Sequence, residues 1–381
     1  MSGRAYLGWF LGVVVTAVVA MVAFNAFADA YLLSTPKGKS LQTVSGFERV
    51  LKPAWLDSIK PDTVFAGSSR MREGFDPTLL DPALHLHSFD YGLSSISPYE
   101  ARRLIQDSAA QPSVRAIFVS MDAFASTAAV ARAGSGFDEL RLAVTASGQP
   151  TPRRSLWLFT TRYLSGGALG MHALSLYLLA QLKSGQPASD RPDLFTAYSR
   201  MTQTGFRKDL AFRYGRQMAW SAPARREFNL ALDALCNTGV RAYLFFPPDH
   251  FAMIARYMAN NADGLLSFKH EVLHDVQRHN VRCRGKVSLF DFLTLNDLTR
   301  ETIGPAGSNS YIDLIHFRPP IGVRLARRML GNNDLGIDLT AAHDPDNEID
   351  RLKNDVAAWR AAHPEIQPSG VAPRPEADKE D

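Results

Sequence analysis

Short apolar runs recur along the chain, and each ends at a glycine, a proline or a polar residue. Five of them have the length and composition of strands in a buried parallel sheet. They cover residues 63–66, 84–91, 116–120, 242–246 and 287–291. Longer stretches with apolar residues at helical spacing separate most of these runs. Strands that alternate with helices predict an α/β protein with a doubly wound, mostly parallel five-stranded sheet.

Helices are predicted over 223–237, 264–280 and 320–330, and after Pro98, because proline suits the first helical turn. Residues 123–213 lack strand signals, and an apolar helical patch lies at 173–182 within them. We interpret 123–213 as a mostly helical insertion that forms a lid or a substrate platform, since long irregular stretches are more often functional than idle.

The C-terminal part beyond the sheet domain changes in character. Residues 331–381 contain a stretch, 347–362, that predicts a charged helix. Residues 363–381 are rich in proline and charge and have little to bury, which predicts a disordered tail.

The N-terminal segment carries no charged residue from Ala5 to Ala28, which is long enough for a membrane-spanning helix. Arg4 precedes it and Asp29 follows, so the positive-inside rule places the N-terminus in the cytoplasm and the body outside. Residues 1–30 are thus predicted as a cytoplasmic tip and single-pass anchor, and 31–60 as a stalk. A cleaved signal peptide is the alternative, because the alanines around Phe27 resemble a cleavage site. In both cases the body is exported.

Composition excludes some function classes. The 381 residues have 46% hydrophobic content and a net charge of +4, and their basic residues are interspersed with nearly as many acidic ones. No basic run with interleaved aromatic residues is present, so nucleic-acid binding is not predicted. The two cysteines, Cys236 and Cys283, lack the close spacing of a zinc site. An exported domain would permit a disulfide between them, and two buried thiols are the alternative.

Polar and small residues follow several predicted strands or the loops near them. The segments are Gly67-Ser68-Ser69, Tyr91-Gly92, Ser120-Met121-Asp122, Pro247-Pro248-Asp249-His250 and Asp313-Leu314-Ile315-His316. Ligands of open α/β sheets bind outside the carboxyl ends of the strands, so we expect these segments to converge there. A serine together with an Asp-x-x-His pair provides the groups for acyl transfer.

Other histidines have simpler interpretations. Asp249-His250 is a rival pair, but adjacent residues point apart, which favours helix capping. His270 and His274 share a helix face at i, i+4 spacing, yet no third ligand is identified, so neither a metal site nor any other cofactor is predicted. His85 and His87 would alternate on one strand face and serve packing.

The segments that end in Ser69, Gly92 and His316 resemble the motifs of the SGNH (GDSL-like) hydrolase superfamily. More narrowly, the chain resembles its membrane-anchored extracytoplasmic branch, which includes DltD-like and alginate O-acetylation-like proteins. The resemblance covers residues 61–330, with the insertion 123–213 outside it. It implies a flavodoxin-like three-layer fold.

The resemblance implies that Ser69 is the nucleophile, His316 the base and Asp313 the group that orients it. Gly92 would donate its N–H to the oxyanion. Ser120-Met121-Asp122 departs from the Gly-x-Asn-Asp element of the superfamily, since an ionised Asp122 has no proton to donate. Three explanations stay open: the backbone groups of Ser69 and Gly92 suffice, Asp122 is protonated, or Asp122 binds something else. Arg70, beside the nucleophile, is expected to steer an anionic sugar or phosphate.

The function implied is O-acyl transfer, through an acyl-serine, on a cell-surface or secreted polysaccharide. The protein would be anchored in the bacterial inner membrane with a periplasmic domain, and a membrane-bound O-acyltransferase would be its partner. An O-acyl esterase of the same fold is the first alternative. A non-catalytic scaffold or glycan-binding component is an alternative of another class, favoured by Asp122.

Overall fold

The computed structural model describes residues 2–27, 48–129, 132–164, 202–213, 217–236, 238–283 and 287–364. The chain divides into two compact units. Residues 1–60 and 136–195 form the first unit, and residues 61–135 and 196–381 form the second. The predicted helical patch at 173–182 and nearly all of the predicted disordered tail lie outside the described residues.

The second unit is built on one sheet of six strands in the order β2-β1-β3-β4-β5-β6. The strands are β1 (Thr63–Gly67), β2 (Ser88–Gly92), β3 (Ala116–Ser120), β4 (Arg241–Phe246), β5 (Val287–Asp291) and β6 (Ile337–Asp338). The first five pair in parallel, and β6 pairs antiparallel to β5. The α/β class and the mostly parallel sheet are confirmed. The count of five strands was wrong, because a two-residue edge strand leaves no hydrophobic pattern to detect.

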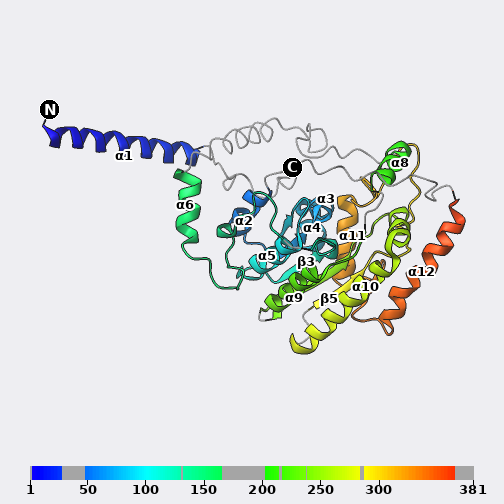
Figure 1. Ribbon diagram of the computed structural model, residues 1–381. Helices are drawn as coiled ribbons and strands as arrows, with labels where there is room; N and C mark the ends of the chain where they lie inside the picture. The colour runs from blue at the N-terminus through cyan, green and yellow to red at the C-terminus, as the bar shows by residue number, and fades with distance from the viewer. Residues whose placement is uncertain are drawn as a thin grey trace. The chain divides into compact units, whose positions relative to one another are not determined.

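Helices pack on the sheet in two groups. On one side α11 (Pro319–Met329) contacts α3 (Ser69–Gly74) and α4 (Pro77–Leu84). On the other, α9 (Ala222–Cys236) contacts α5 (Pro98–Ala109) and α10 (Phe251–Cys283), and Figure 1 shows the long α10 running beside α9. The two helix groups explain why the strands are apolar on both faces.

One face of the sheet carries a stack of aromatic side chains. The core cluster beneath α4 and α11 includes Phe65, Phe118, Tyr243, Phe245 and Phe290. Their ring centroids lie 4.7 Å apart between Phe65 and Phe118 and 4.6 Å apart between Phe118 and Tyr243. Phe65, Phe118 and Tyr243 are paired residues of the neighbouring strands β1, β3 and β4, so their stacking follows the parallel register.

The second strand begins later than the sequence indicates. β2 starts at Ser88, and the preceding residues belong to the end of α4. His85 is the C-cap of α4 in the left-handed conformation, with φ of 55°, and His87 precedes the strand. The prediction that both histidines pack on a strand face was therefore wrong, because a helix end and a turn occupy this stretch.

The charged helix predicted at 347–362 is present as α12 (Pro345–Ala362). It lies along α10, as Figure 1 shows, and Trp359 packs edge-on against Phe251 with ring centroids 5.2 Å apart. α10 itself is interrupted at Asn261, whose backbone is not helical. The helix predicted at 264–280 is its second part.

The first unit contains α1 (Gly3–Phe27), α2 (Glu48–Ile59) and α6 (Arg154–Leu164). An 18-residue window of α1 has a mean hydropathy of 2.4 and none of it is buried. By length and composition α1 suits a membrane span, and a signal sequence would share both properties. In the predicted insertion, 123–213, the described helices are the 3-10 turn Glu139–Arg141, α6 and α8 (Gln203–Phe212), and a further 3-10 turn, Met121–Ala123, lies at its start.

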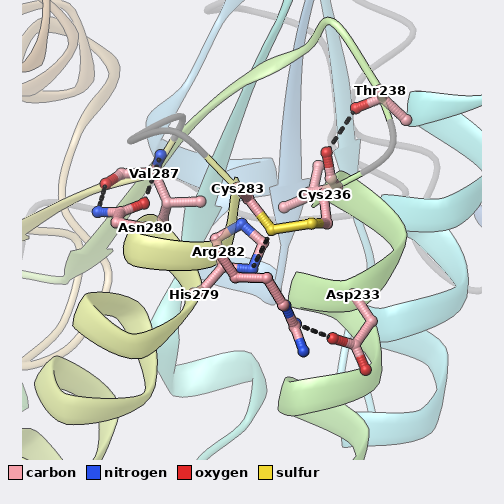
Figure 2. The surroundings of a disulfide bond; sticks show 9 residues. Asp233, Cys236, Thr238, His279, Asn280, Arg282, Cys283 and Val287 are labelled. Atoms are coloured by element: carbon pink, nitrogen blue, oxygen red, sulfur yellow. Dashed lines mark hydrogen bonds and ion pairs between the residues drawn. A yellow bond between two sulfur atoms is a disulfide. The ribbon is translucent and has the colours of Figure 1, made fainter.

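A disulfide joins Cys236 at the end of α9 to Cys283 at the end of α10 (Figure 2). Their Cα atoms lie 5.1 Å apart, and 47 positions separate them in the sequence. Next to the bridge, Asn280 exchanges two hydrogen bonds with the backbone of Val287 at the start of β5. Of the two alternatives left open by the sequence, the structure has the disulfide, which suits an oxidising compartment.

Candidate active site

The first strand carries a serine to the carboxyl edge of the sheet. β1 ends at Gly67, whose φ of 151° L side chains rarely adopt. A Cβ there would lie 2.5 Å from Ser120 Oγ, so glycine lets the ends of β1 and β3 approach. Ser68 then caps α3, because its Oγ accepts a hydrogen bond from Arg70 N at 3.1 Å. These contacts fix Ser69 in the first turn of α3.

Ser69, His316 and Asp313 form a continuous chain of hydrogen bonds. Ser69 Oγ lies 2.8 Å from His316 Nε2, although 247 positions separate the two residues. On the other side of the ring, His316 Nδ1 lies 2.7 Å from Asp313 Oδ2. The arrangement has a hydroxyl, an imidazole and a carboxylate in the order that activates a serine nucleophile.

The Asp313 to His316 segment is a loop rather than a helical turn. Asp313 Oδ1 accepts hydrogen bonds from the backbone N–H groups of Ile315 at 2.9 Å and His316 at 2.8 Å. A bridge between Tyr311 and Phe317 closes the base of the loop. The carboxylate of Asp313 therefore shapes the loop with one oxygen and holds the imidazole with the other.

Asp209 and Arg213, at the C-terminal end of α8, also contact the histidine loop. Arg213 Nη2 lies 2.9 Å from Asp313 Oδ2, and Arg213 Nε lies 2.7 Å from Asp209 Oδ1. Asp209 Oδ2 in turn accepts the N–H of Leu314 at 3.0 Å. One turn of α8 thus binds both the side chain and the backbone of the histidine loop.

These contacts fix the protonation state of Asp313. Burial alone would raise the pKa of its carboxyl group, but the hydrogen bond and charge of His316 and the charge of Arg213 lower this pKa well below its ordinary value. Asp313 is therefore ionised at neutral pH and accepts the Nδ1–H of His316. This leaves Nε2 of a neutral His316 free of its own proton and able to accept one from Ser69.

Arg70, which follows the serine, is buried and ion-paired. Its side chain is 1% exposed, and its guanidinium lies 2.6 Å from Asp122 Oδ2 and 2.7 Å from Asp249 Oδ2. Its Nε donates to the carbonyl of Ile315 at 3.0 Å. Arg70 therefore connects the ends of three strands with the histidine loop, and its role in steering an anionic ligand stays a prediction.

Asp122 binds its neighbours as an anion. Its Oδ2 accepts the hydroxyl hydrogen of Ser68 at 2.5 Å in addition to its ion pair with Arg70. Burial alone would raise the pKa of Asp122, but the charge of Arg70 and the Ser68 hydrogen bond lower it. Of the three explanations for this position, the contacts with Arg70 and Ser68 favour an ionised Asp122 that binds its neighbours.

Gly92 lies against the serine turn but its N–H points to a side chain. Gly92 N donates to Asp90 Oδ1 at 2.7 Å. A Cβ on Gly92 would lie 2.5 Å from Arg72 N and 2.9 Å from Ser68 O, so only glycine allows β2 to end against the first turn of α3. The backbone N–H predicted to bind an oxyanion therefore donates to Asp90 in this structure.

A cavity of about 520 Å³ adjoins this network on the Asp122 side. Its lining consists of Arg70, Asp122, residues 125–128, Gln217 and Met218. Hydroxyl, amide and charged groups thus line a space of the size that binds small ligands. The chain passes from β1 to β2 on one side and then to β3 on the other, so the order of the strands reverses at the neighbouring ends of β1 and β3. The cavity lies beside the end of β3, where open α/β sheets bind ligands.

Asp249 and His250, the rival pair, have different roles. Asp249 pairs with Arg70 and accepts the hydroxyl of Tyr257 at 2.6 Å. His250 caps α10, since its Nδ1 accepts the N–H of Ala252 at 3.2 Å, and burial lowers its pKa. Helix capping is confirmed for His250, and the buried carboxylate of Asp249 belongs to the Arg70 network.

Sequence reasoning missed Arg213 and Asp209, which belong to the predicted insertion. Arg213 and Asp313 are 100 positions apart along the chain, and no sequence motif links two residues at such a distance. The only available signal was the i, i+4 spacing of the Asp209 and Arg213 pair, which many surface helices share.

No protein-family model matches this chain, and a search of curated proteins found no match to it.

Proposed function

We propose that this protein transfers O-acyl groups through an acyl-serine at Ser69, with His316 as general base and Asp313 as its orienting carboxylate. The observation that carries the proposal is the 2.8 Å contact of Ser69 Oγ with His316 Nε2, in a chain that continues to Asp313. A serine hydroxyl at this distance from a neutral imidazole is within the reach of a general base. The SGNH-like character of the fold is part of this proposal.

In the first half-reaction His316 Nε2 accepts the Ser69 proton while Oγ bonds to the carbonyl carbon of an ester. The tetrahedral intermediate collapses when the imidazolium gives that proton to the leaving alkoxide, which leaves an acyl-serine and an alcohol. In the second half-reaction the imidazole deprotonates a sugar hydroxyl, whose oxygen bonds to the acyl carbon. The bond to Ser69 Oγ then breaks, and the imidazolium returns the proton to Oγ. Asp313 remains ionised throughout and stabilises the imidazolium.

Few of the expected oxyanion donors are available, which favours a low basal rate of acyl transfer. Asp122 carries a negative charge and the Gly92 N–H is bound to Asp90, so the Ser69 N–H is the remaining donor of the expected set. Loss of one such donor costs about 10²–10³-fold in kcat. We propose that the acceptor or a membrane-bound O-acyltransferase partner releases the Gly92 N–H, which would favour transfer over free hydrolysis.

The proposed location is the outer side of the bacterial inner membrane, with α1 as the anchor. The long apolar helix and the disulfide support an exported domain. The proposed acceptor is a cell-surface or secreted polysaccharide, which the polar lining of the 520 Å³ cavity suits. The intact mass of the protein extracted from membranes will distinguish an anchor from a cleaved signal.

The test is hydrolysis of p-nitrophenyl acetate by the full chain in detergent, together with labelling by a fluorophosphonate. We expect slow turnover and labelling at Ser69, with both lost in Ser69→Ala and in His316→Ala. His343→Ala, which changes an exposed histidine, is the matched control. Turnover and labelling that survive in Ser69→Ala would reject the assignment, and a wild-type chain that neither reacts with the probe nor turns over would favour the scaffold alternative.

A further inference from the structure

Two histidines of α10 face the first turns of α12. His270 and His274 are one helical turn apart, and α12 starts with Pro345. His270 Nδ1 lies 2.6 Å from Asp346 Oδ1, and His274 Nε2 lies 3.8 Å from the same oxygen. The third ligand that the sequence left unidentified thus comes from a helix 76 positions further along the chain.

His270 is held between two carboxylates. Its Nδ1 faces Asp346, while its Nε2 lies 3.0 Å from Asp350 Oδ1. Carboxylates only accept hydrogen bonds, and a neutral imidazole has a single N–H to donate. A neutral His270 can therefore donate to only one of the two carboxylates. The other ring nitrogen needs a proton or a metal ion between it and the carboxylate oxygen.

We propose that His270, His274 and Asp346 bind a divalent transition metal ion of the Zn²⁺ class. The ligand atoms are His270 Nδ1, His274 Nε2 and a carboxylate oxygen of Asp346, and the three lie within 4.8 Å of one another. In a tetrahedral site with bonds of about 2.0–2.1 Å the ligand atoms are about 3.3 Å apart. Small side-chain rotations bring the present separations of 2.6 and 3.8 Å to that value.

Asp350 completes the arrangement from outside the coordination sphere. A metal-bound histidine ordinarily donates its other ring N–H to a carboxylate, which fixes the ring and its tautomer. With Nδ1 on the metal, the Nε2–H of His270 donates to Asp350 at 3.0 Å. The two carboxylates thus have different roles, and both contacts of His270 are satisfied.

The donor set selects the metal. Two imidazoles and one carboxylate suit zinc and its neighbours, whereas magnesium and calcium prefer oxygen ligands. The four side chains are between 24% and 58% exposed, so ions have direct access. A second cluster, formed by His279 and the two cysteines, is unsuitable because its sulfur atoms are bonded to each other and supply no thiolate.

The bound metal would clamp α12 to α10. A ligand that binds only the folded state stabilises it by RT ln(1 + [L]/Kd). Since the ligands come from both helices, removal of the metal is expected to lower the melting temperature. The site needs no acyl-transfer activity, so its test is independent of the proposed function.

The experiment uses the full chain in detergent, purified on a tag without histidine and stripped with EDTA. Titration with Co²⁺ is expected to give visible ligand-field absorption that saturates at one ion per chain and is displaced by Zn²⁺. The variants His274→Gln and Asp346→Asn are expected to weaken binding more than tenfold, and Asp350→Asn by about tenfold. His343→Gln and His279→Gln are controls that keep wild-type affinity.

Each variant is first compared with the wild type by thermal melting without metal, which shows that it folds. The rise in melting temperature on adding Zn²⁺ should disappear in Asp346→Asn and persist in His343→Gln. Unchanged Co²⁺ affinity in Asp346→Asn, or no ligand-field absorption in the wild type, would overturn the proposal. Binding that is lost with His279→Gln would also overturn it, because that result places the ion elsewhere.

Discussion

At the scale of single residues, the site depends on how a few charges are paired. Arg70 pairs with both Asp122 and Asp249, and Arg213 pairs with Asp313. Motif spacing identified Ser69, Asp313 and His316, because those residues lie in short local patterns. It missed the arginine contacts, since a guanidinium chooses its carboxylates in space and the sequence contains many of both.

Arg213→Ala should lower kcat for acyl-ester hydrolysis about tenfold, which corresponds to about 1.4 kcal/mol of transition-state stabilisation. The reason is that Arg213 contacts Asp313 Oδ2 at 2.9 Å and helps to keep that carboxylate ionised and in place. KM should change little because Arg213 does not line the cavity. Steady-state kinetics of Arg213→Ala and Arg213→Lys test this, and the lysine variant should recover part of kcat. A loss of thermal stability with unchanged kcat would mean that Arg213 only docks α8.

Asp122→Asn should destabilise the fold by about 1–3 kcal/mol at pH 7, since it removes the charged acceptor of the Ser68 hydroxyl and one of the two carboxylates that pair with Arg70, while Asp249 remains. The folded-state pKa of Asp122 is lowered, so its stabilisation is complete above its ordinary value of 3.8 and is lost as the pH falls through the lower folded-state value. The difference between wild type and variant should therefore shrink as the pH falls below that value. Urea unfolding at a series of pH values measures it, with the exposed Asp297→Asn as control. A difference that stays constant with pH would contradict the ionised state of Asp122.

At the scale of elements, the strand pattern indicated where loops converge, and the sheet order decided which loops are neighbours. The order β2-β1-β3 places the ends of β2 and β3 on either side of the serine turn. Apolar runs in sequence identify strands without their order, because every parallel strand presents the same pattern. The short β6 and the late start of β2 were missed for the same local reason.

Gly92→Ala should destabilise the protein by about 1–3 kcal/mol, which is the usual cost of overpacking. The added Cβ would lie 2.5 Å from Arg72 N and would push β2 away from the turn that holds Ser69. Chemical denaturation and the rate of fluorophosphonate labelling measure the two effects. Gly239→Ala is the matched control, since nothing lies within 4 Å of its Cβ position. If the two variants had the same free energy of unfolding, the serine turn would accommodate the added methyl group without loss of stability, which contradicts the prediction.

At the scale of the whole molecule, the disulfide closes a long loop through the second unit. The bridge between Cys236 and Cys283 links α9 and α10 across a sequence separation of 47 residues. From the sequence, the two cysteines of an exported domain could form a disulfide or remain as two buried thiols. The folded arrangement of the two helix ends selects the bridge.

The double variant Cys236→Ser and Cys283→Ser should lose up to about 4 kcal/mol of unfolding free energy, which is the loop-closure entropy for this separation. Urea unfolding under non-reducing conditions measures the loss. The same variant should match the wild type measured after reduction with dithiothreitol. A wild type whose stability is insensitive to the reductant, together with an unaffected variant, would show that the bridge does not form in solution.

The sequence by itself determined the α/β class, five of the six strands, the apolar N-terminal helix and the segments that carry Ser69, Asp313 and His316. These features depend on local periodicity, composition and short spacing, which act between residues near each other in the chain. The tertiary structure alone decided the strand order, the pairing of Arg70 with Asp122 and Asp249, and the contact of Arg213 with Asp313. It also decided the placement of Asp346 beside two histidines of α10. Those side-chain contacts join residues that lie between 52 positions apart, for Arg70 and Asp122, and 179 positions apart, for Arg70 and Asp249. Their free energies depend on burial and distance, which exist only once the chain has folded.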